Sequence, residues 1–266
     1  MTSKERHEAR YQRRKEKREQ KRQEKIRESL HFDTVFTFRH LYHSARACFR
    51  GVSWKASVQA YKARCGINVA RTLRELKQRI FRQRRAPEFI TRERGHERRI
   101  NSIHIMDRVP EKCNSKYSLK QVLHRSVIYD NYSSQEGKGT ELARNRLKCM
   151  LERHIRRFGI TGGIIIYDFH GYFDSIQHDI IKGIMQKNYK DPDIIGINMK
   201  IVSKNRVRIG LVLGSENSQD FAIAVPNTID HYIKEIMRAD EYGRYNDDGW
   251  IIHHDFDRLE EIYQEM

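Results

Sequence analysis

The segment Arg244–Trp250, with the sequence Arg-Tyr-Asn-Asp-Asp-Gly-Trp, constrains the fold of this chain more than any other stretch. Its Asn-Asp-Asp-Gly string lies between β-prone residues. Because Asn, Asp and Gly tolerate the unusual φ values of tight turns, the segment predicts a β-hairpin. A plain surface hairpin explains the turn but not the two adjacent acids. Two carboxylates at such a turn repel each other unless a cation lies between them, and hard divalent cations take oxygen ligands. A cation site here needs a further carboxylate from another part of the chain.

Residues 163–168, Gly-Ile-Ile-Ile-Tyr-Asp, supply that carboxylate. The run is apolar and β-branched throughout, which is typical of a buried central strand. Asp168 ends it, and an acid at the end of such a strand, before a turn into a helix, is a common position for ligand groups. If this strand lies beside the hairpin, Asp168, Asp247 and Asp248 converge. Three converging carboxylates can hold two Mg²⁺ ions, the geometry that serves in-line phosphoryl transfer.

The rest of the chain predicts further elements around these two segments. The spacing of apolar residues indicates helices in most of the remaining chain, with two further pairs of strands. Helices are expected over three segments between residues 32 and 85 (the last over 68–85), over 107–123, up to residue 158 and over 220–237; strand pairs are expected over 88–91 with 99–105 and over 201–203 with 207–209.

The charge balance predicts a polyanionic partner. The formal net charge is +17, from 52 Lys and Arg against 35 Asp and Glu, and nucleic acid is the simplest polyanion that such a surface binds. Residues 1–30 are almost entirely Lys, Arg, Glu and Gln, which predicts a solvated helix or a disordered arm. Such an arm can lie along a phosphate backbone, or it can be a solubilising tail.

Membrane and disulfide chemistry are not expected. No run approaches the ~18 apolar residues of a membrane span. The N-terminus lacks the apolar core of a signal peptide. The four cysteines form no Cys-x-x-Cys pair, so we expect reduced thiols, a cytoplasmic protein and no membrane partner.

Three segments, in this order, resemble the palm motifs of reverse transcriptases. Tyr167–Asp174 (Tyr-Asp-Phe-His-Gly-Tyr-Phe-Asp) resembles the first motif, Gly214-xxx-Ser218-Gln219 the second, and Tyr245–Asp248 the third. Upstream, the segment from Arg98 to Val109 and the segment 129–140 resemble the fingers of bacterial reverse transcriptases. The Gly-xxx-Ser-Gln form is similar to that of diversity-generating retroelements and stand-alone phage-defence enzymes, whereas group II intron proteins usually carry Pro-Gln-Gly. The resemblance covers about residues 35–262.

The resemblance implies an α+β fold of the right-hand polymerase type, with fingers and a palm whose antiparallel sheet carries packed helices. We expect a basic helical or disordered arm over residues 1–31, mostly helical fingers with a β-hairpin over 32–158, and a palm with three polymerase motifs over 159–266. The family's helical thumb has no counterpart before Met266. Three explanations stay open: the chain is a fragment, a partner grips the duplex, or activity is weak.

The resemblance also assigns roles to particular residues. Asp168, Asp247 and Asp248 would be the catalytic residues and, with the backbone carbonyl of Phe169, the ligands of Mg²⁺, for which Mn²⁺ is a substitute. Nucleotide contacts would come from Arg98, Phe173 and Gln219, and template or primer contacts from Lys138, Ser218 and Tyr245. Phe173 would lie under the sugar and exclude a 2′-hydroxyl, which favours deoxynucleotides.

The implied activity is that of an RNA-directed DNA polymerase, a nucleotidyltransferase, in a bacterial or phage retroelement or antiviral defence system. Its partners would be an RNA template, a nucleic-acid primer and dNTPs, with an accessory protein or a homo-oligomer as further alternatives. A non-catalytic RNA-binding protein on the same scaffold is the main competing hypothesis, and an RNA-dependent RNA polymerase is a third. His253-His254-Asp255 is a weaker candidate for cation binding, because adjacent residues of a strand point to opposite faces.

Overall fold

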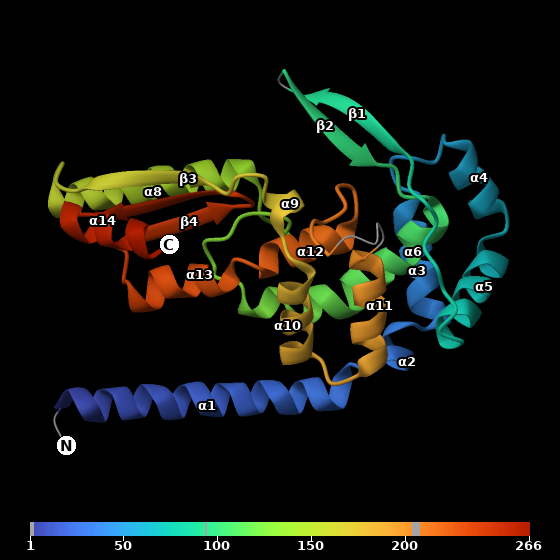
Figure 1. Cartoon of the computed structure of the whole chain (residues 1–266), viewed down its shortest axis with the longest axis horizontal. Coiled ribbons are helices and arrows are strands. Elements are labelled where there is room, and N and C mark those ends of the chain that lie inside the picture. Colours follow the sequence, from blue (N-terminus) through green and yellow to red (C-terminus); the bar gives the residue numbers. More distant parts are fainter. Residues whose placement is uncertain (1–2, 94, 204–207) are drawn as a thin grey trace.

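The computed structural model describes residues 3–93, 95–203 and 208–266, and the protein is of the α+β class (Figure 1). The first half is mostly helical and contains a two-stranded antiparallel sheet. The second half contains a three-stranded antiparallel sheet with helices packed on it. The predicted fold class, an antiparallel sheet with packed helices, is confirmed. The predicted division into arm, fingers and palm stays a prediction.

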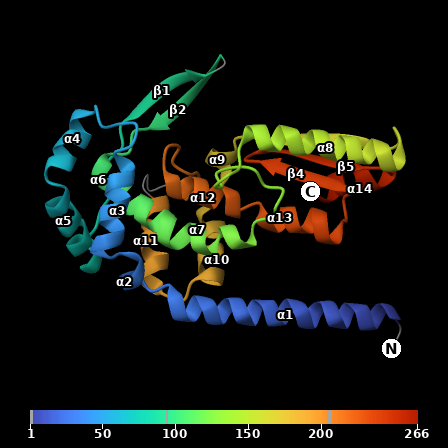
Figure 2. The ribbon, with the colours of Figure 1, turned by 180° about the vertical axis from the view of Figure 1, so that it is seen from behind.

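The first half of the chain begins with one long helix that lies alongside the rest of the molecule (Figures 1 and 2). Its elements are α1 (Ser3–Ser29), α2 (Phe32–Val35), α3 (Phe38–Cys48), α4 (Ala56–Ala63), α5 (Cys65–Lys77), β1 (Glu88–Glu93), β2 (His96–Asn101), α6 (Ile105–Asn114), the π-helical turn η1 (Ser115–Leu119), α7 (Lys120–Val122), the 3₁₀ turn η2 (His124–Ser126) and α8 (Thr140–Phe158). Among the described contacts of helix α1 with the body, the Tyr11 hydroxyl donates to Glu235 at 3.4 Å, and the Gln23 amide donates to the Lys187 carbonyl at 3.4 Å.

Helices α2 to α7 bury their apolar residues, as their helical spacing predicts, in one cluster that they share with helices of the second half. Leu41, Val69, Leu76 and Val109 are within it. Helix α5 ends at Lys77, short of the predicted end at residue 85. Arg79 takes a positive φ of 61°, which an α-helix cannot continue through. The hairpin of β1 and β2 then extends away from the helices (Figure 1).

The second half of the chain holds the sheet β3–β5–β4. Its elements are β3 (Gly163–Asp168), α9 (Tyr172–Ser175), α10 (His178–Asn188), α11 (Pro192–Val202), α12 (Glu216–Ala224), α13 (Asn227–His231), the π-helical turn η3 (Tyr232–Ile236), β4 (Glu241–Tyr245), β5 (Asp248–His253) and α14 (Phe256–Glu265). Both neighbouring strand pairs are antiparallel. The two segments predicted as strand and hairpin therefore lie side by side.

Strand β3 is not the central strand that its composition predicts. It lies at the sheet edge, and β5 is central. Ile165 and Tyr167 pack into the cluster under α14 and η3, whereas Ile164 and Ile166 are 39% and 73% exposed on the other face. An unbroken apolar run shows that a strand is apolar on both faces, but it does not show whether both faces are covered.

Helix α11 replaces the strand predicted over residues 201–203. The Asp191 side chain caps α11 by accepting from the Asp193 amide, and Pro192 occupies the first turn, where a missing N–H costs nothing. This Asp-Pro start signal outweighs the β-branched residues near the helix end. The expected turn at Lys204-Asn205 and the first residue of the strand expected over 207–209 lie outside the described residues. The helix predicted over 220–237 starts earlier, at Glu216, and is interrupted near Pro226.

Two apolar clusters cover opposite faces of the larger sheet. On one face, Tyr242 and Ile251 pack with α14. On the other, Trp250 packs with Met150 of α8, and its ring stacks on Tyr132 with centroids 5.8 Å apart. No helix in the described part of the chain is both long and apolar enough to cross a bilayer. Burial on both faces fixes the register of β4 and β5, and with it the position of the turn between them.

Candidate active site

The strand register brings the three predicted carboxylates together. Asp168, the last residue of β3, is the Cα partner of Asp248, the first residue of β5, and Asp247 precedes it in the turn. Directly opposed residues of antiparallel strands project to the same face with Cβ atoms about 4.5–5.5 Å apart. The Phe169 amide donates to the Asp247 carbonyl at 3.2 Å, which fixes the turn against the end of β3. The register therefore brings the three residues to the same edge of the sheet.

The carboxylate group is electrostatically uncompensated. In the described part of the chain, none of the three side chains has a hydrogen bond or ion pair, although Asp168 and Asp248 are exposed and Asp247 is half-buried. The pKa of Asp248 is raised above its ordinary value by partial burial and by the charges of Asp247 and Asp168. A divalent cation relieves such repulsion. Three carboxylates form an all-oxygen donor set. Such a set fits Mg²⁺, which takes one or two carboxylates and keeps water ligands.

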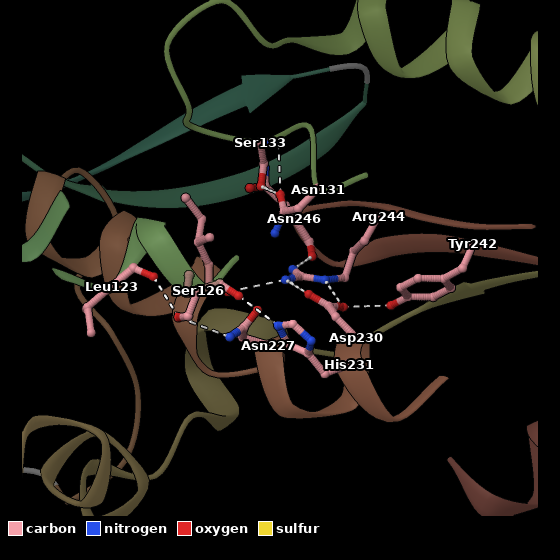
Figure 3. Close-up of polar contacts among 12 residues, drawn as sticks. Leu123, Ser126, Asn131, Ser133, Asn227, Asp230, His231, Tyr242, Arg244 and Asn246 are labelled. Carbon is pink, nitrogen blue, oxygen red and sulfur yellow. Dashed lines mark hydrogen bonds and ion pairs between the residues drawn. The ribbon is translucent and has the colours of Figure 1, made fainter. Parts of the chain in front are cut away.

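The buried side chain of Arg244 stabilises the turn between β4 and β5 (Figure 3). The side chain of Arg244 is fully buried in β4, and its Nη1 donates to the Asn246 carbonyl at 2.7 Å. Its Nε and Nη2 each donate at 2.8 Å to one oxygen of Asp230, which is also fully buried. Asn246 has a φ of 55°, a conformation that Asn adopts more readily than most residues. The turn that carries two of the three aspartates is thus fixed by an ion pair beneath the sheet.

The network continues through two tyrosines. The Tyr242 hydroxyl donates to Asp230 at 2.7 Å and contacts the Tyr167 hydroxyl at 2.8 Å. Burial alone would lower the pKa of the Arg244 guanidinium, but hydrogen bonds and the charge of Asp230 outweigh it and raise that pKa. The arginine therefore stays charged. Sequence reasoning missed this pair, and its single local signal was an arginine between the two tyrosines that precede the predicted turn.

The carboxylates open onto a cleft of about 1130 Å³ between the β1–β2 hairpin and the sheet. The hairpin contributes Glu88, Glu97, Arg99 and Asn101 to its wall. Opposite them lie the residues after β3 and the turn between β4 and β5. The cleft is slightly larger than the roughly 300–1,000 Å³ of most small-molecule sites.

The cleft contains six of the predicted site residues. They are Asp168, Phe169, Phe173, Tyr245, Asp247 and Asp248. Phe173 is half-buried and packs edge-on against Tyr172, with ring centroids 5.8 Å apart. Its ring therefore has a fixed position in the cleft wall, five residues after Asp168.

Four predicted residues lie elsewhere or outside the described side chains. Ser218 is buried in α12, where its backbone amide donates to the helix-capping Ser215 at 3.4 Å, and Gln219 is exposed on the same helix. Neither residue is among those that line the cleft. The side chain of Arg98, in β2, is outside the described part of the structure. The roles expected for these residues stay predictions.

Lys138 is bound within its own loop. Its ammonium donates to the Tyr129 carbonyl at 2.6 Å and to the Asn131 carbonyl at 2.8 Å. Partial burial lowers the pKa of this lysine. In this conformation the lysine fixes the loop before α8, so contact with a template requires these two hydrogen bonds to break.

The glycine of the second motif is explained by close backbone packing. Gly214 has a φ of 104°, and a Cβ at this position would lie 2.7 Å from the Asn101 carbonyl oxygen of β2. The Asn101 amide in turn donates to the Leu213 carbonyl at 3.1 Å. Residues 213–214 therefore join the hairpin to α12, so this motif shapes the cleft wall through its backbone.

Neither a family model nor a curated protein matches the sequence. Similar solved structures include apo telomerase from Candida tropicalis truncated from its C-terminal domain, at 14% identity and a TM-score of 0.48, covering 68% of this chain and 46% of that one. Telomerase from Candida albicans in complex with a fragment of telomeric RNA is 10% identical with a TM-score of 0.48, covering 71% of this chain and 40% of that one. A partial Cas6-RT-Cas1–Cas2 complex is 15% identical with a TM-score of 0.47, covering 84% of this chain and 38% of that one. The chain spans less than half the length of each. These likenesses are remote, and the chemistry of the site rests on the geometry above.

Proposed function

We propose that this chain is a template-directed nucleotidyltransferase that copies RNA into DNA. The observation that carries the proposal is the register of Asp168 opposite Asp248, with Asp247 adjacent in a turn held by Arg244. Three carboxylates that have no ion pair within the described part of the chain, at the wall of a cleft large enough for a nucleotide, are suited to metal-assisted phosphoryl transfer. The order of the three palm-like segments in the sequence supports a polymerase over other enzymes that use such a site.

In this reaction the 3′-oxygen of a primer attacks the α-phosphate of a dNTP, and the bond to pyrophosphate breaks. Asp168, Asp247 and Asp248 would hold two Mg²⁺ ions, with the Phe169 carbonyl as a further ligand. When bound, these ions supply charge stabilisation at the attacking and leaving oxygens. The Arg244–Asp230 pair keeps the turn in place before substrate arrives. Such positioning matters because catalysis of phosphoryl transfer consists almost entirely of orientation and electrostatics.

Phe173 supports a preference for deoxynucleotides. Its ring lies in the cleft wall close in sequence to Asp168, and its edge-on contact with Tyr172 limits its movement. A rigid aromatic ring under the sugar leaves no space for a 2′-hydroxyl and offers it no hydrogen-bond partner. An enzyme that makes RNA needs both.

An RNA template and a nucleic-acid primer are the partners that fit the surface. The net charge is +17, and α1 carries many Lys and Arg side chains along its length. Neutralised phosphates release counterions, which favours binding of any nucleic acid. A bacterial or phage retroelement or defence role rests on the Gly-xxx-Ser-Gln resemblance alone. A cytoplasmic location rests on the cysteine pattern, which favours reduced thiols.

The test is incorporation of labelled dNTPs by the purified full chain on a primed RNA template with Mg²⁺. Asp247→Asn should abolish incorporation and leave RNA affinity unchanged. Asp174→Asn is the matched control, because Asp174 also lines the cleft but lies in α9, away from the opposed strand ends. Unchanged incorporation in Asp247→Asn would exclude the proposed site. RNA binding without incorporation by the unaltered chain would favour a non-catalytic RNA-binding protein, and preferential use of NTPs would favour an RNA polymerase.

A further inference from the structure

A second group of metal-ligating side chains lies at the opposite end of the β4–β5 hairpin. Asp240, His253 and His254 present ligand atoms that all lie within 4.8 Å of one another. His253 ends β5, five residues from Asp248, so the two groups are separated by roughly 17 Å of strand. Asp240 directly precedes β4, and continuing the register of that pair places it opposite His253. The strand pairing itself therefore assembles this group.

The two histidines lie on the same side although they are adjacent in sequence. Their rings stack with centroids 4.7 Å apart and planes inclined by 21°. Strand β5 ends at His253, so the alternation of side chains that argued against a site no longer applies at His254. The ring of Phe158, at the end of α8, stacks on His254 at 4.3 Å. The three stacked rings hold both imidazoles in fixed orientations.

Each imidazole has its Nδ1 engaged by the protein. His254 Nδ1 lies 2.6 Å from an oxygen of Asp240, whose same oxygen accepts from the His254 amide at 2.9 Å. His253 Nδ1 accepts from the Asp255 amide at 3.0 Å and lies 3.1 Å from the Asp255 carbonyl oxygen. The Asp240 carboxylate lies on the Nδ1 side of the His254 ring, so a metal that binds both residues would take the place of the proton between them.

Asp240, rather than Asp255, is the carboxylate of the group. Asp255 caps α14, and its side chain accepts from the amides of Asp257 and Arg258 at 3.0 and 3.2 Å. Asp240 instead accepts from the His254 amide and contacts the His254 ring.

We infer that Asp240, His253 and His254 form a Zn²⁺ site that joins the start of β4 to the end of β5. Two imidazoles and one carboxylate, with a fourth position open to water, are a ligand set that suits Zn²⁺ and not Mg²⁺. Its role is structural: the site ties together the open end of the hairpin whose turn carries Asp247 and Asp248. Figure 2 shows β5, α8 and α14 gathered at this end of the molecule. The inference does not depend on the proposed polymerase activity.

The test is Zn²⁺ binding by the tag-free full chain, measured by calorimetry and by the visible absorption of a Co²⁺-substituted sample. A Cys149→Ser background removes an exposed thiol that could bind the same metals. The unaltered site should take one Zn²⁺ per chain, and millimolar Mg²⁺ should not compete. At a free Zn²⁺ concentration of ~100 times Kd, the folded-to-unfolded ratio should rise by about 100-fold.

Asp240→Asn, His253→Gln and His254→Gln should each weaken binding by more than about tenfold. Asp255→Asn is the matched control, because Asn also caps a helix and should leave Zn²⁺ affinity unchanged. Equal Zn²⁺ affinity in all variants would overturn the site, as would a Co²⁺ sample of the unaltered chain without the absorption of a nitrogen-ligated ion. The Co²⁺ measurement needs no variant, so a variant that fails to fold leaves the decision intact.

Discussion

Replacing Arg244 with Met removes one half of a fully buried ion pair. The methionine fills most of the space that the arginine occupied. Asp230, however, remains charged and fully buried. Of the side-chain partners described above, it keeps the Tyr242 hydroxyl. Breaking a buried pair from one side costs about 3–5 kcal/mol, because an uncompensated charge stays in the interior. The Asn246 carbonyl also loses its donor. We expect the free energy of unfolding to fall by about 3–5 kcal/mol.

Urea unfolding measures this change, read as a shift in midpoint at constant slope. Arg92→Met is the matched control, because Arg92 pairs with Glu97 at 2.8 Å but is 79% exposed, and an exposed pair contributes about 0–1 kcal/mol. The double variant Arg244→Met with Asp230→Leu removes both charges, so it should recover much of the lost stability. If Arg244→Met is no more destabilising than Arg92→Met, the pair does not support the fold as argued.

The double variant also separates stability from positioning. Its core is neutral, but the Asn246 carbonyl still lacks its donor, so nucleotide incorporation should stay reduced while stability recovers. Incorporation that recovers together with stability would show that Arg244 acts on folding alone and does not position the turn.

Three other substitutions test separate parts of the site. Asp248→Asn should raise stability at pH 7 while abolishing incorporation. The raised pKa of Asp248 means that the folded state favours the protonated acid. The stabilisation that this acid provides is therefore full below its ordinary pKa of 3.8 and is lost as pH rises. The urea midpoints of Asp248→Asn and the unaltered protein should converge below about pH 4. Gly249→Ala should destabilise by about 1–3 kcal/mol in the same assay, since its Cβ would lie 2.2 Å from the Tyr167 ring, whose hydroxyl is held by Tyr242 at 2.8 Å. Phe173→Ala should increase NTP incorporation relative to dNTP incorporation in primer-extension assays, and an unchanged ratio would exclude Phe173 as the sugar-sensing residue.

The elements with strong local signals could be predicted from the sequence. The Asn-Asp-Asp-Gly turn, the strand ending at Asp168 and the helix ending at Phe158 all form where expected. The predicted convergence of the carboxylates depends on one assumption, that these strands are neighbours. The pairing of Asp168 with Asp248 confirms that the strands are neighbours.

The features that depend on distant partners could not be predicted. The exposure of Ile166 depends on which face of β3 a helix covers, and the run of isoleucines carries no information about that. The Arg244–Asp230 pair joins β4 to α13, and a sequence of charges does not show which of them are buried together. Asp240 could not be linked to the histidines, because its place opposite His253 follows from the strand register alone.

Mn²⁺ binding at the cleft tests the central claim, that Asp168, Asp247 and Asp248 form one cation site, most directly. It is followed by electron paramagnetic resonance on the full chain with dNTP present and with Zn²⁺ saturating the His253–His254 group. We predict Mn²⁺ binding that Mg²⁺ displaces and that Asp168→Asn and Asp248→Asn each remove, while Asp174→Asn retains it. Binding that survives both substitutions, or no binding by the unaltered protein, would contradict the account.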